Sequence, residues 1–377
     1  MKKSNKTPFI VLAILFFLAL ATVLFMMFAV HRNGEVLGAP GPKISFLNNL
    51  RYAIRLYSNL DDLQEFVVFD IAAERKFELN YNDSATDVCR NLQEEGFVYS
   101  AISAFDLMVY KGYDRSLSPG TYTISSGLNA IETLDFISNG DNRDLHFTIF
   151  AGWRLEEIAQ VIDQLGFEFD GYAFLAYAKN PHSEIRANLQ LPAGRSLEGY
   201  MHPGEYSLKP TITGEEFVDE ALGRTQAVID EAIPLLNDQS RRLTTDQIII
   251  LASIIQRETL ASEEMPTISS VFYNRLEINM PLQTDPTVQY AIGYNQNGEN
   301  WWKSPLTYDD LAIDSDYNTY KVFGLTPGAI SNPGREAIMA AFRPERSDYF
   351  YFRAKCDGSL THNFAISYEE HLANGCE

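Results

Sequence analysis

The chain has few basic residues and few cysteines, and each shortage argues against one class of function. Its 377 residues carry 30 Lys and Arg against 50 Asp and Glu, a formal net charge of −20. No dense Lys/Arg block follows the first few residues, so nucleic acid is not expected as a partner, because phosphate binding needs a basic surface. The cysteines are too few and too scattered for a metal site. Cys89 falls at a helix-core position, whereas Cys356 and Cys376 could pair in an oxidising compartment.

One long apolar run is present near the N-terminus. Residues 8–30 are continuously apolar apart from Thr22 and carry no charge. At 1.5 Å per residue such a helix spans about 34 Å, enough to cross a bilayer. Three lysines precede it, so the positive-inside rule places residues 1–7 in the cytoplasm and the rest outside. The alternative is a signal peptide cut near Gly38, but signal h-regions run only about 7–15 residues. We therefore expect a single-pass anchor in the cytoplasmic membrane.

An internal repeat follows a juxtamembrane linker over residues 31–63. Residues 77–97 align without gaps on 147–167, and each copy shows strand alternation, a polar turn and a helix closed by Gly. A turn into a strand over 117–124 lies between them. Such units of strand, helix, helix and strand resemble LysM carbohydrate-binding modules, so residues 64–167 are interpreted as a LysM-like repeat region. The alternative is two generic α+β units with no ligand.

A helical connector is expected next, over residues 168–243. It contains one unusual segment, residues 197–206, whose clustered Gly, Pro, Tyr and His favour an ordered loop. The remaining residues, 244–377, are interpreted as the catalytic domain. The expected fold is α+β throughout, with LysM-like units followed by a mainly helical domain that has a small β element.

The candidate catalytic residue is Glu258, near the end of a helix predicted over residues 246–259. The N-cap is expected at Thr244, Thr245 or Asp246. Residues three, four, seven and eight positions before Glu258 are all Ile or Leu, which places the carboxyl on the apolar face. Desolvation and the negative end of the helix dipole both favour its protonated form, as a general acid requires. The alternative is a structural Glu paired with Arg257, Arg275 or Arg335.

Polar and aromatic strings downstream of Glu258 favour a cleft for glycan. They lie at residues 282–290, 316–320, 324–334 and 361–364. Amide and hydroxyl groups interleaved with Tyr rings suit a sugar polymer, which needs hydrogen bonds for its hydroxyls and aromatic rings for its faces. Each string alone could be ordinary turn chemistry, as at Asp285-Pro286.

The sequence resembles the endolytic murein transglycosylase family, membrane-anchored lytic enzymes that cut nascent peptidoglycan. The resemblance covers essentially the whole chain and is carried by residues 251–259, 282–287, 317–320 and 324–329. Glu258 takes the position of the catalytic glutamate, and Gln256 stands where some relatives carry another Glu. Two departures concern accessory contacts: Ala151-Gly152 replaces Glu-Gly, and residues 201–206 depart from the usual Phe-Pro-Asp pattern.

The resemblance implies a mechanism with one acid and no metal or cofactor. Protonated Glu258 would donate to the oxygen between N-acetylmuramic acid and N-acetylglucosamine, and its carboxylate would then accept the C6 hydroxyl proton, giving a 1,6-anhydro end. Such cleavage would limit the length of new strands, with partners in the wall-synthesis machinery. The residues expected to shape the cleft are Gln283, Thr284, Asp285, Tyr317, Asn318 and Tyr320.

Two alternatives remain at this point. The first is a hydrolase in which Glu258 is the acid and Asp285 or Glu205 its partner, since most glycosidases need two carboxylates. The second is a non-catalytic, membrane-tethered protein that binds peptidoglycan. Binding alone gives no reason for an acid on the apolar face of a helix.

Overall fold

The computed structural model describes residues 7–69 and 73–375, so the N-terminal lysines and Cys376 lie outside the described residues. It divides the chain into two compact units. The first consists of residues 1–146 and 207–210, and the second of residues 147–206 and 211–377. Cys89 is buried and free, as its core position predicted, and Cys356 is disulfide-bonded.

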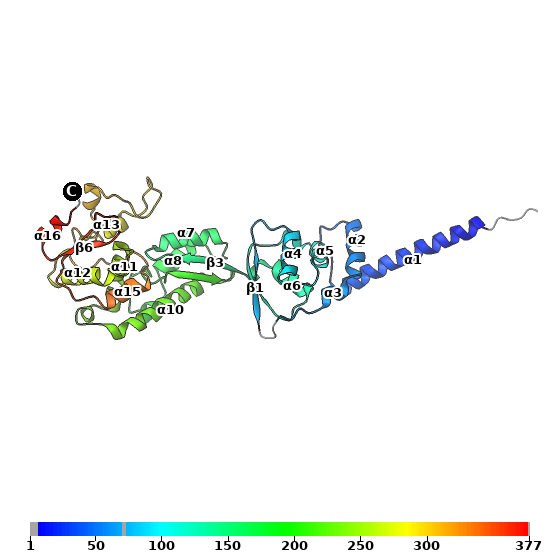
Figure 1. Cartoon of the computed structure of the whole chain (residues 1–377), viewed down its shortest axis with the longest axis horizontal. Helices are drawn as coiled ribbons and strands as arrows, with labels where there is room; N and C mark the ends of the chain where they lie inside the picture. The colour runs from blue at the N-terminus through cyan, green and yellow to red at the C-terminus, as the bar shows by residue number, and fades with distance from the viewer. Residues whose placement is uncertain (1–6, 70–72, 376–377) are drawn as a thin grey trace, which may run out of the picture. The chain divides into compact units, whose positions relative to one another are not determined.

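The first unit contains the long N-terminal helix and a small α+β body (Figure 1). Its elements in chain order are α1 (Thr7–Val36), α2 (Phe46–Tyr57), α3 (Leu60–Gln64), β1 (Glu74–Leu79), α4 (Ala85–Glu94), α5 (Ala101–Lys111), β2 (Gly120–Ser125) and α6 (Ala130–Ser138). Strands β1 and β2 are antiparallel, with Phe77 opposite Tyr122, and both rings are fully buried in the core of the unit.

Helix α1 contains the one segment among the described residues that is long and apolar enough to cross a membrane, Ile10–Val36. Its last turns are tied into the first unit. Asn33 is fully buried and its Nδ2 donates to the carbonyl oxygen of Ala53 at 2.6 Å, while Leu37 lies in the hydrophobic core. The predicted N-terminal helix is therefore confirmed, and it continues into the folded body.

Both copies of the sequence repeat form a strand, a turn and a helix, as predicted. The first copy continues in the order β1-α4-α5-β2. The second begins with β3 (Arg143–Ile149), α7 (Leu155–Leu165) and α8 (Gly171–Lys179), and β4 (Gly204–Leu208) closes it. The strand order in the sheet is β1-β2-β3-β4. Strand β4 was not expected, because only its alternate residues Tyr206 and Leu208 are buried and five residues give a weak period-two signal.

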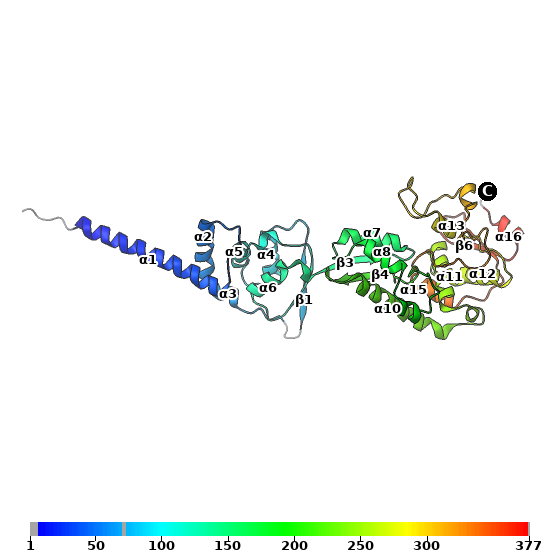
Figure 2. The same ribbon diagram turned by 180° about the vertical axis from the view of Figure 1, so that it is seen from behind.

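The second unit is mainly helical, with a two-stranded β element within residues 244–377 (Figures 1 and 2). After β4 its elements are α10 (Gly214–Ala232), α11 (Thr245–Glu258), α12 (Met265–Glu277), α13 (Asp285–Ile292), α14 (Tyr308–Leu311), α15 (Arg335–Phe342), β5 (Tyr351–Ala354), β6 (His362–Ala365) and α16 (Tyr368–Ala373); the short α9 (Ser183–Asn188) precedes β4. Helices α12 and α15 pack against α11, which is buried from Ile248 to Gln256.

Candidate active site

Helix α11 brings Glu258 to the edge of the buried core. The helix starts at an N-cap on Thr244, whose hydroxyl accepts from the backbone N–H of Gln247 at 3.2 Å, while the Gln247 side chain accepts from the backbone N–H of Thr244 at 2.9 Å. Its apolar residues fix it between neighbouring helices, and Thr259 ends it in an extended conformation. The carboxyl of Glu258 therefore stands on the last turn of a rigid helix.

Glu258 faces a cavity of about 580 Å³ in the second unit. This volume is within the range of small-ligand pockets. Its lining comes from the helices α11, α12 and α16, from strand β5, from the segment at the start of α13 and from the loop between α14 and α15. The lining residues are Glu258, Arg275, Leu282, Gln283, Asp285, Tyr320, Tyr351, Phe352, Arg353, Tyr368 and His371. The cavity thus combines one acid on an apolar helix with Tyr hydroxyls, amides and guanidinium groups.

Burial raises the pKa of the Glu258 carboxyl to about 7. The Asp285 carboxylate contributes to this raised pKa, whereas Thr284, Arg275 and Arg257 favour the charged form. The Thr284 hydroxyl is buried, and among the described residues it has no hydrogen-bond partner other than Glu258. Because the Glu258 side chain is partly exposed towards the cavity, a substrate can reach it. A carboxyl with a pKa near 7 can both donate and accept a proton near neutral pH.

The three arginines considered as structural partners of Glu258 are each engaged elsewhere. Arg335 pairs with Glu231. The Arg257 guanidinium lies 3.7 Å from the ring centroid of Trp302. Arg275 is buried, with its Nε donating to the carbonyl oxygen of Phe350 and an Nη to that of Leu282, both at 2.6 Å.

Arg275 therefore holds two backbone segments at the cavity and supplies a positive field without an ion pair to Glu258 within the described residues. This arrangement weighs against the structural interpretation of Glu258, since a structural carboxylate in such a site would be paired directly.

Gln283, Asp285 and Tyr320 line the cavity, whereas Thr284 is buried between Gln283 and Asp285 and does not line it. Thr319 joins the two segments: its carbonyl accepts from the backbone N–H of Gln283 at 3.1 Å, and its hydroxyl accepts from that of Thr284 at 3.0 Å. The Tyr320 hydroxyl donates to Asp285 Oδ1 at 2.6 Å. Gln283 has a φ of +49°, a left-handed conformation that non-glycine residues adopt at some energetic cost and that is common at functional sites.

Tyr317 and Asn318 do not line this cavity. The Tyr317 ring lies 4.9 Å from that of Tyr290 on α13. Asn318 is fully buried, where its Nδ2 donates to the carbonyl oxygens of Leu311 and Ile313 and its Oδ1 accepts from the backbone N–H of Tyr320 at 3.1 Å. Asn318 thus positions Tyr320 rather than facing the cavity itself.

Sequence reasoning missed one wall of the cavity, formed by β5 and α16. Tyr351, Tyr368 and His371 form a group of rings with centroids 5.3 to 6.1 Å apart. Burial lowers the pKa of His371, and the charges of Arg353 and Arg275 lower it further, so His371 is neutral near pH 7. The only sequence signal for this wall was the aromatic run around Tyr351, which is equally typical of a core strand.

The unusual segment 197–206 has a structural anchor in Glu198, which is almost fully buried. Its two oxygens accept from the backbone N–H of Leu155, at 3.2 and 3.3 Å, and Oε1 also accepts from Asn332 Nδ2 at 3.1 Å. Asn332 Oδ1 in turn accepts from the backbone N–H of Gly199 at 2.9 Å. Burial raises the pKa of Glu198 to about 8. The segment therefore links the start of α7 to the loop before α15.

Comparison with known proteins identifies relatives along most of the chain. The model of the YceG-like family matches residues 77–376. An endolytic murein transglycosylase of Bacillus subtilis (strain 168) is 30% identical over 301 residues, covering 76% of this chain and 80% of its own length. One of Streptococcus pneumoniae (strain R6) is 29% identical over 315 residues, covering 77% of this chain and 56% of the relative. A crystal structure of a YceG-like protein from Listeria monocytogenes has a TM-score of 0.57 at 29% identity, covering 80% of this chain and 98% of that one.

Proposed function

The chain belongs to the YceG-like family, and from this premise and the Glu258 cavity we propose that it is an endolytic murein transglycosylase. Such an enzyme is a lyase that cuts the glycan strands of peptidoglycan. The observation that carries the proposal is a carboxyl with a pKa of about 7 on the wall of a 580 Å³ cavity rich in tyrosine and arginine. The names of the relatives weigh against a non-catalytic binding protein.

In the proposed reaction Glu258 acts first as an acid and then as a base. Its proton passes to the oxygen between N-acetylmuramic acid and N-acetylglucosamine as the C1–O bond breaks. The resulting carboxylate accepts the proton of the muramoyl C6 hydroxyl, whose oxygen bonds to C1 and closes the 1,6-anhydro ring. Glu258 ends protonated again, so no water is consumed. A pKa near 7 supports both steps, because neither form of the carboxyl is costly to reach at neutral pH.

The neighbours of Glu258 are proposed to set its charge and hold the sugar. Asp285 is held by Tyr320 and disfavours a second negative charge, which keeps Glu258 protonated before the reaction. Thr284 and Arg275 favour the carboxylate once it forms. Gln283 lines the cavity and is proposed to bind sugar hydroxyls, while Asn318 and Tyr317 shape the loop behind it.

One observation favours a second candidate, a two-carboxylate hydrolase: Asp285 lines the same cavity as Glu258. Glu205 does not support it, because it is an exposed residue of β4 that does not line that cavity. The hydrogen bond from Tyr320 to Asp285 Oδ1 restricts that carboxylate as a base or nucleophile. The two reactions leave different chain ends, a 1,6-anhydro end after transglycosylation and a reducing end after hydrolysis.

The N-terminal helix supports a single-pass anchor in the cytoplasmic membrane, with both folded units on the extracytoplasmic side. The β1-α4-α5-β2 body would then be a LysM-like glycan-binding unit next to the membrane. Such a tether would direct cleavage to newly made strands and so limit their length, beside proteins of the wall-synthesis machinery.

The test is the Glu258→Gln variant, which keeps the shape of the side chain but cannot exchange a proton. We expect loss of glycan cleavage with an unchanged circular dichroism spectrum. The control is Asp314→Asn, the same kind of substitution at an exposed carboxylate that does not line the cavity, and it should retain full activity. Full activity of Glu258→Gln would contradict the proposed role.

A further inference from the structure

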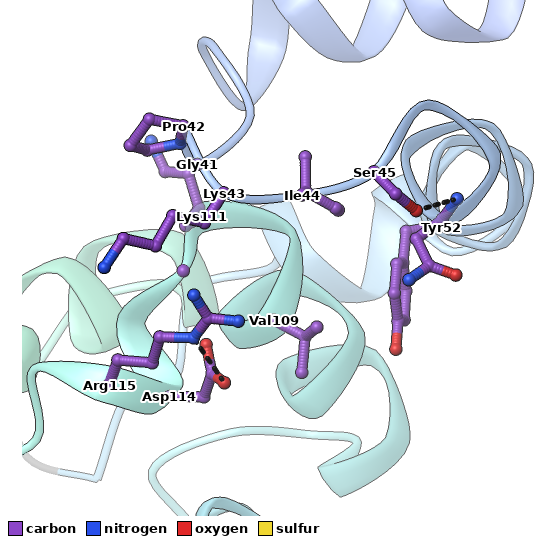
Figure 3. A pocket seen from close by; sticks show the side chains of 12 residues that line it. Gly41, Pro42, Lys43, Ile44, Ser45, Tyr52, Val109, Lys111, Asp114 and Arg115 are labelled. Carbon is purple, nitrogen blue, oxygen red and sulfur yellow. Dashed lines mark hydrogen bonds and ion pairs between the residues drawn. The ribbon is translucent and has the colours of Figure 1, made fainter.

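A second cavity, of about 340 Å³, lies in the first unit close to the end of the membrane-crossing helix (Figure 3). One side is the loop from Gly41 to Ser45 with the first turns of α2, and the other is the end of α5 with the turn after it. Three cationic side chains and one carboxylate line it: Lys43, Lys111, Arg115 and Asp114. In a chain with a net charge of −20 this cavity is a local positive site.

The cations of this cavity are weakly paired. Lys43 is exposed and forms no ion pair with the described residues. The Lys111 ammonium lies 5.7 Å from the ring centroid of Tyr113. Within residues 7–69 and 73–375, Arg115 forms an ion pair with Asp114 alone, at 3.8 Å and on the protein surface. Such a pair contributes little, because water screens it. Three guanidinium or ammonium groups are therefore available to an anion.

The start of α2 adds backbone donors to the same cavity. Ser45 is the N-cap, with its hydroxyl accepting from the backbone N–H of Asn48 at 3.3 Å, as Figure 3 shows. The first turn of this 12-residue helix contains no acidic residue. Because Ser45 and Asn48 line the cavity, the positive end of the helix dipole would favour an anion bound there, as at other helix N-termini that bind phosphate.

The cavity is held open by a close backbone contact. The N–H of Gly41 donates to the carbonyl oxygen of Tyr110 at 2.8 Å. A Cβ at position 41 would lie only 2.7 Å from the carbonyl oxygen of Lys111. Only glycine allows the loop to approach α5 so closely, so the positions of Lys43 and Lys111 are fixed relative to one another.

An apolar groove of about 540 Å³ lies on the neighbouring face of α2. Its lining comes from α1 and α2: Val23, Met26, Met27, Val30, His31, Phe46, Asn49 and Leu50. The α1 residues belong to the segment that is apolar enough to cross a membrane. In a bilayer crossed by α1 the groove would adjoin the lipid chains, and the cationic cavity is lined by Asn48 and Tyr52 from another side of α2.

We propose that the cationic cavity and the apolar groove form one binding site for an anionic phospholipid of the bilayer that α1 crosses. Its phosphate contacts Lys43, Lys111 and Arg115, and one acyl chain lies in the groove between α1 and α2. The combination of a cationic cavity and an apolar groove favours an anionic lipid, because a soluble phosphate would not need the groove and a neutral lipid would not need the cations. The bound lipid would fix the first unit at the membrane surface.

The experiment is native mass spectrometry of the full-length protein in an uncharged detergent, titrated with phosphatidylglycerol. The variant is Lys43→Gln with Lys111→Gln, and the matched control is Lys76→Gln with Arg90→Gln, which removes two exposed cations elsewhere in the first unit. Each cation near an anionic headgroup contributes about fivefold in affinity, so we expect about 30-fold weaker binding in the first pair and little change in the control. Lys43→Gln alone, at an exposed residue, should weaken binding about fivefold.

Two further measurements separate the possible sources of phosphate. Phe46→Gln in the groove should weaken binding of phosphatidylglycerol, and sn-glycerol 3-phosphate should bind far more weakly than the lipid. The proposal is wrong if both double variants lose lipid equally, if the Lys43 and Lys111 variant keeps its affinity, or if glycerol phosphate binds as tightly as the lipid. All of these variants should still cleave uncrosslinked glycan in detergent, so this result does not depend on the function proposed for Glu258.

Discussion

The pH dependence of cleavage follows directly from the surroundings of Glu258. Burial raises the pKa of this carboxyl from an ordinary value of 4.5 to about 7, and the charge of Asp285 adds to the effect. The reaction requires the protonated form in the free enzyme. Activity should therefore be present below pH 7 and be lost as pH rises through 7, about tenfold in kcat/KM for each further pH unit.

The assay is the initial rate of release of soluble fragments from uncrosslinked glycan strands, measured from pH 5 to pH 9 at constant ionic strength. At pH 9 about one hundredth of Glu258 remains protonated, so kcat/KM should fall to about 1% of its plateau. Asp285→Asn removes the neighbouring negative charge, which lowers the pKa of Glu258 and should move the fall in activity to lower pH. Asp314→Asn, at an exposed residue that does not line the cavity, should leave the profile unchanged.

A profile that stays flat to pH 9, or one that falls near pH 4.5, would refute this account of Glu258. A shift of the Asp285→Asn profile to higher pH would refute the charge argument separately. Loss of activity in Asp285→Asn at every pH would indicate that Asp285 reacts directly, as in a hydrolase.

Three other variants test the structure around the site. Glu258→Gln should raise the free energy of unfolding by about 3 kcal/mol at pH 8 and by less than about 1 kcal/mol at pH 5, because a carboxyl with a raised pKa destabilises the fold once it is deprotonated. Urea denaturation at both pH values measures this. Glu198→Ala should lower the free energy of unfolding by about 2–3 kcal/mol, because it leaves the buried Leu155 N–H and the Asn332 amide unpaired. Glu198→Gln should lower it by less, and equal losses in the two variants would contradict this role of Glu198. Tyr368→Ala should raise KM for glycan without changing the melting temperature, whereas the 93% exposed Tyr308→Ala should change neither.

Helix periodicity and capping predicted the elements around Glu258 well. The Ile and Leu residues before Glu258 predicted a helix, and Thr244 was among the expected caps, although the structure buries this helix on all sides from Ile248 to Gln256 and not along one face. The repeat was also readable, because Phe77 and Phe147 begin strands of the same pattern. Strand β4 was missed since its burial alternates over only five residues.

The composition of the cavity was harder to predict, because it depends on which loops meet in space. Gln283 and Tyr320 are brought together by Thr319, a contact between segments that sequence spacing does not show. Asn318 was expected in the cleft because its amide can form several hydrogen bonds with a sugar. In the structure the same amide forms these bonds with backbone carbonyls in the protein interior. The wall of Tyr351 and His371 comes from a strand and a helix about a hundred residues after Glu258, and nothing in their local pattern points to Glu258.

The chemistry of the product ends shows whether Glu258 drives transglycosylation. Purified full-length protein would be incubated with uncrosslinked glycan strands, and the fragments analysed by mass spectrometry. We expect 1,6-anhydro-N-acetylmuramic acid ends, which are one water lighter than reducing ends, and no such ends with Glu258→Gln. Reducing ends from the unaltered protein would contradict transglycosylation and assign the reaction to hydrolysis.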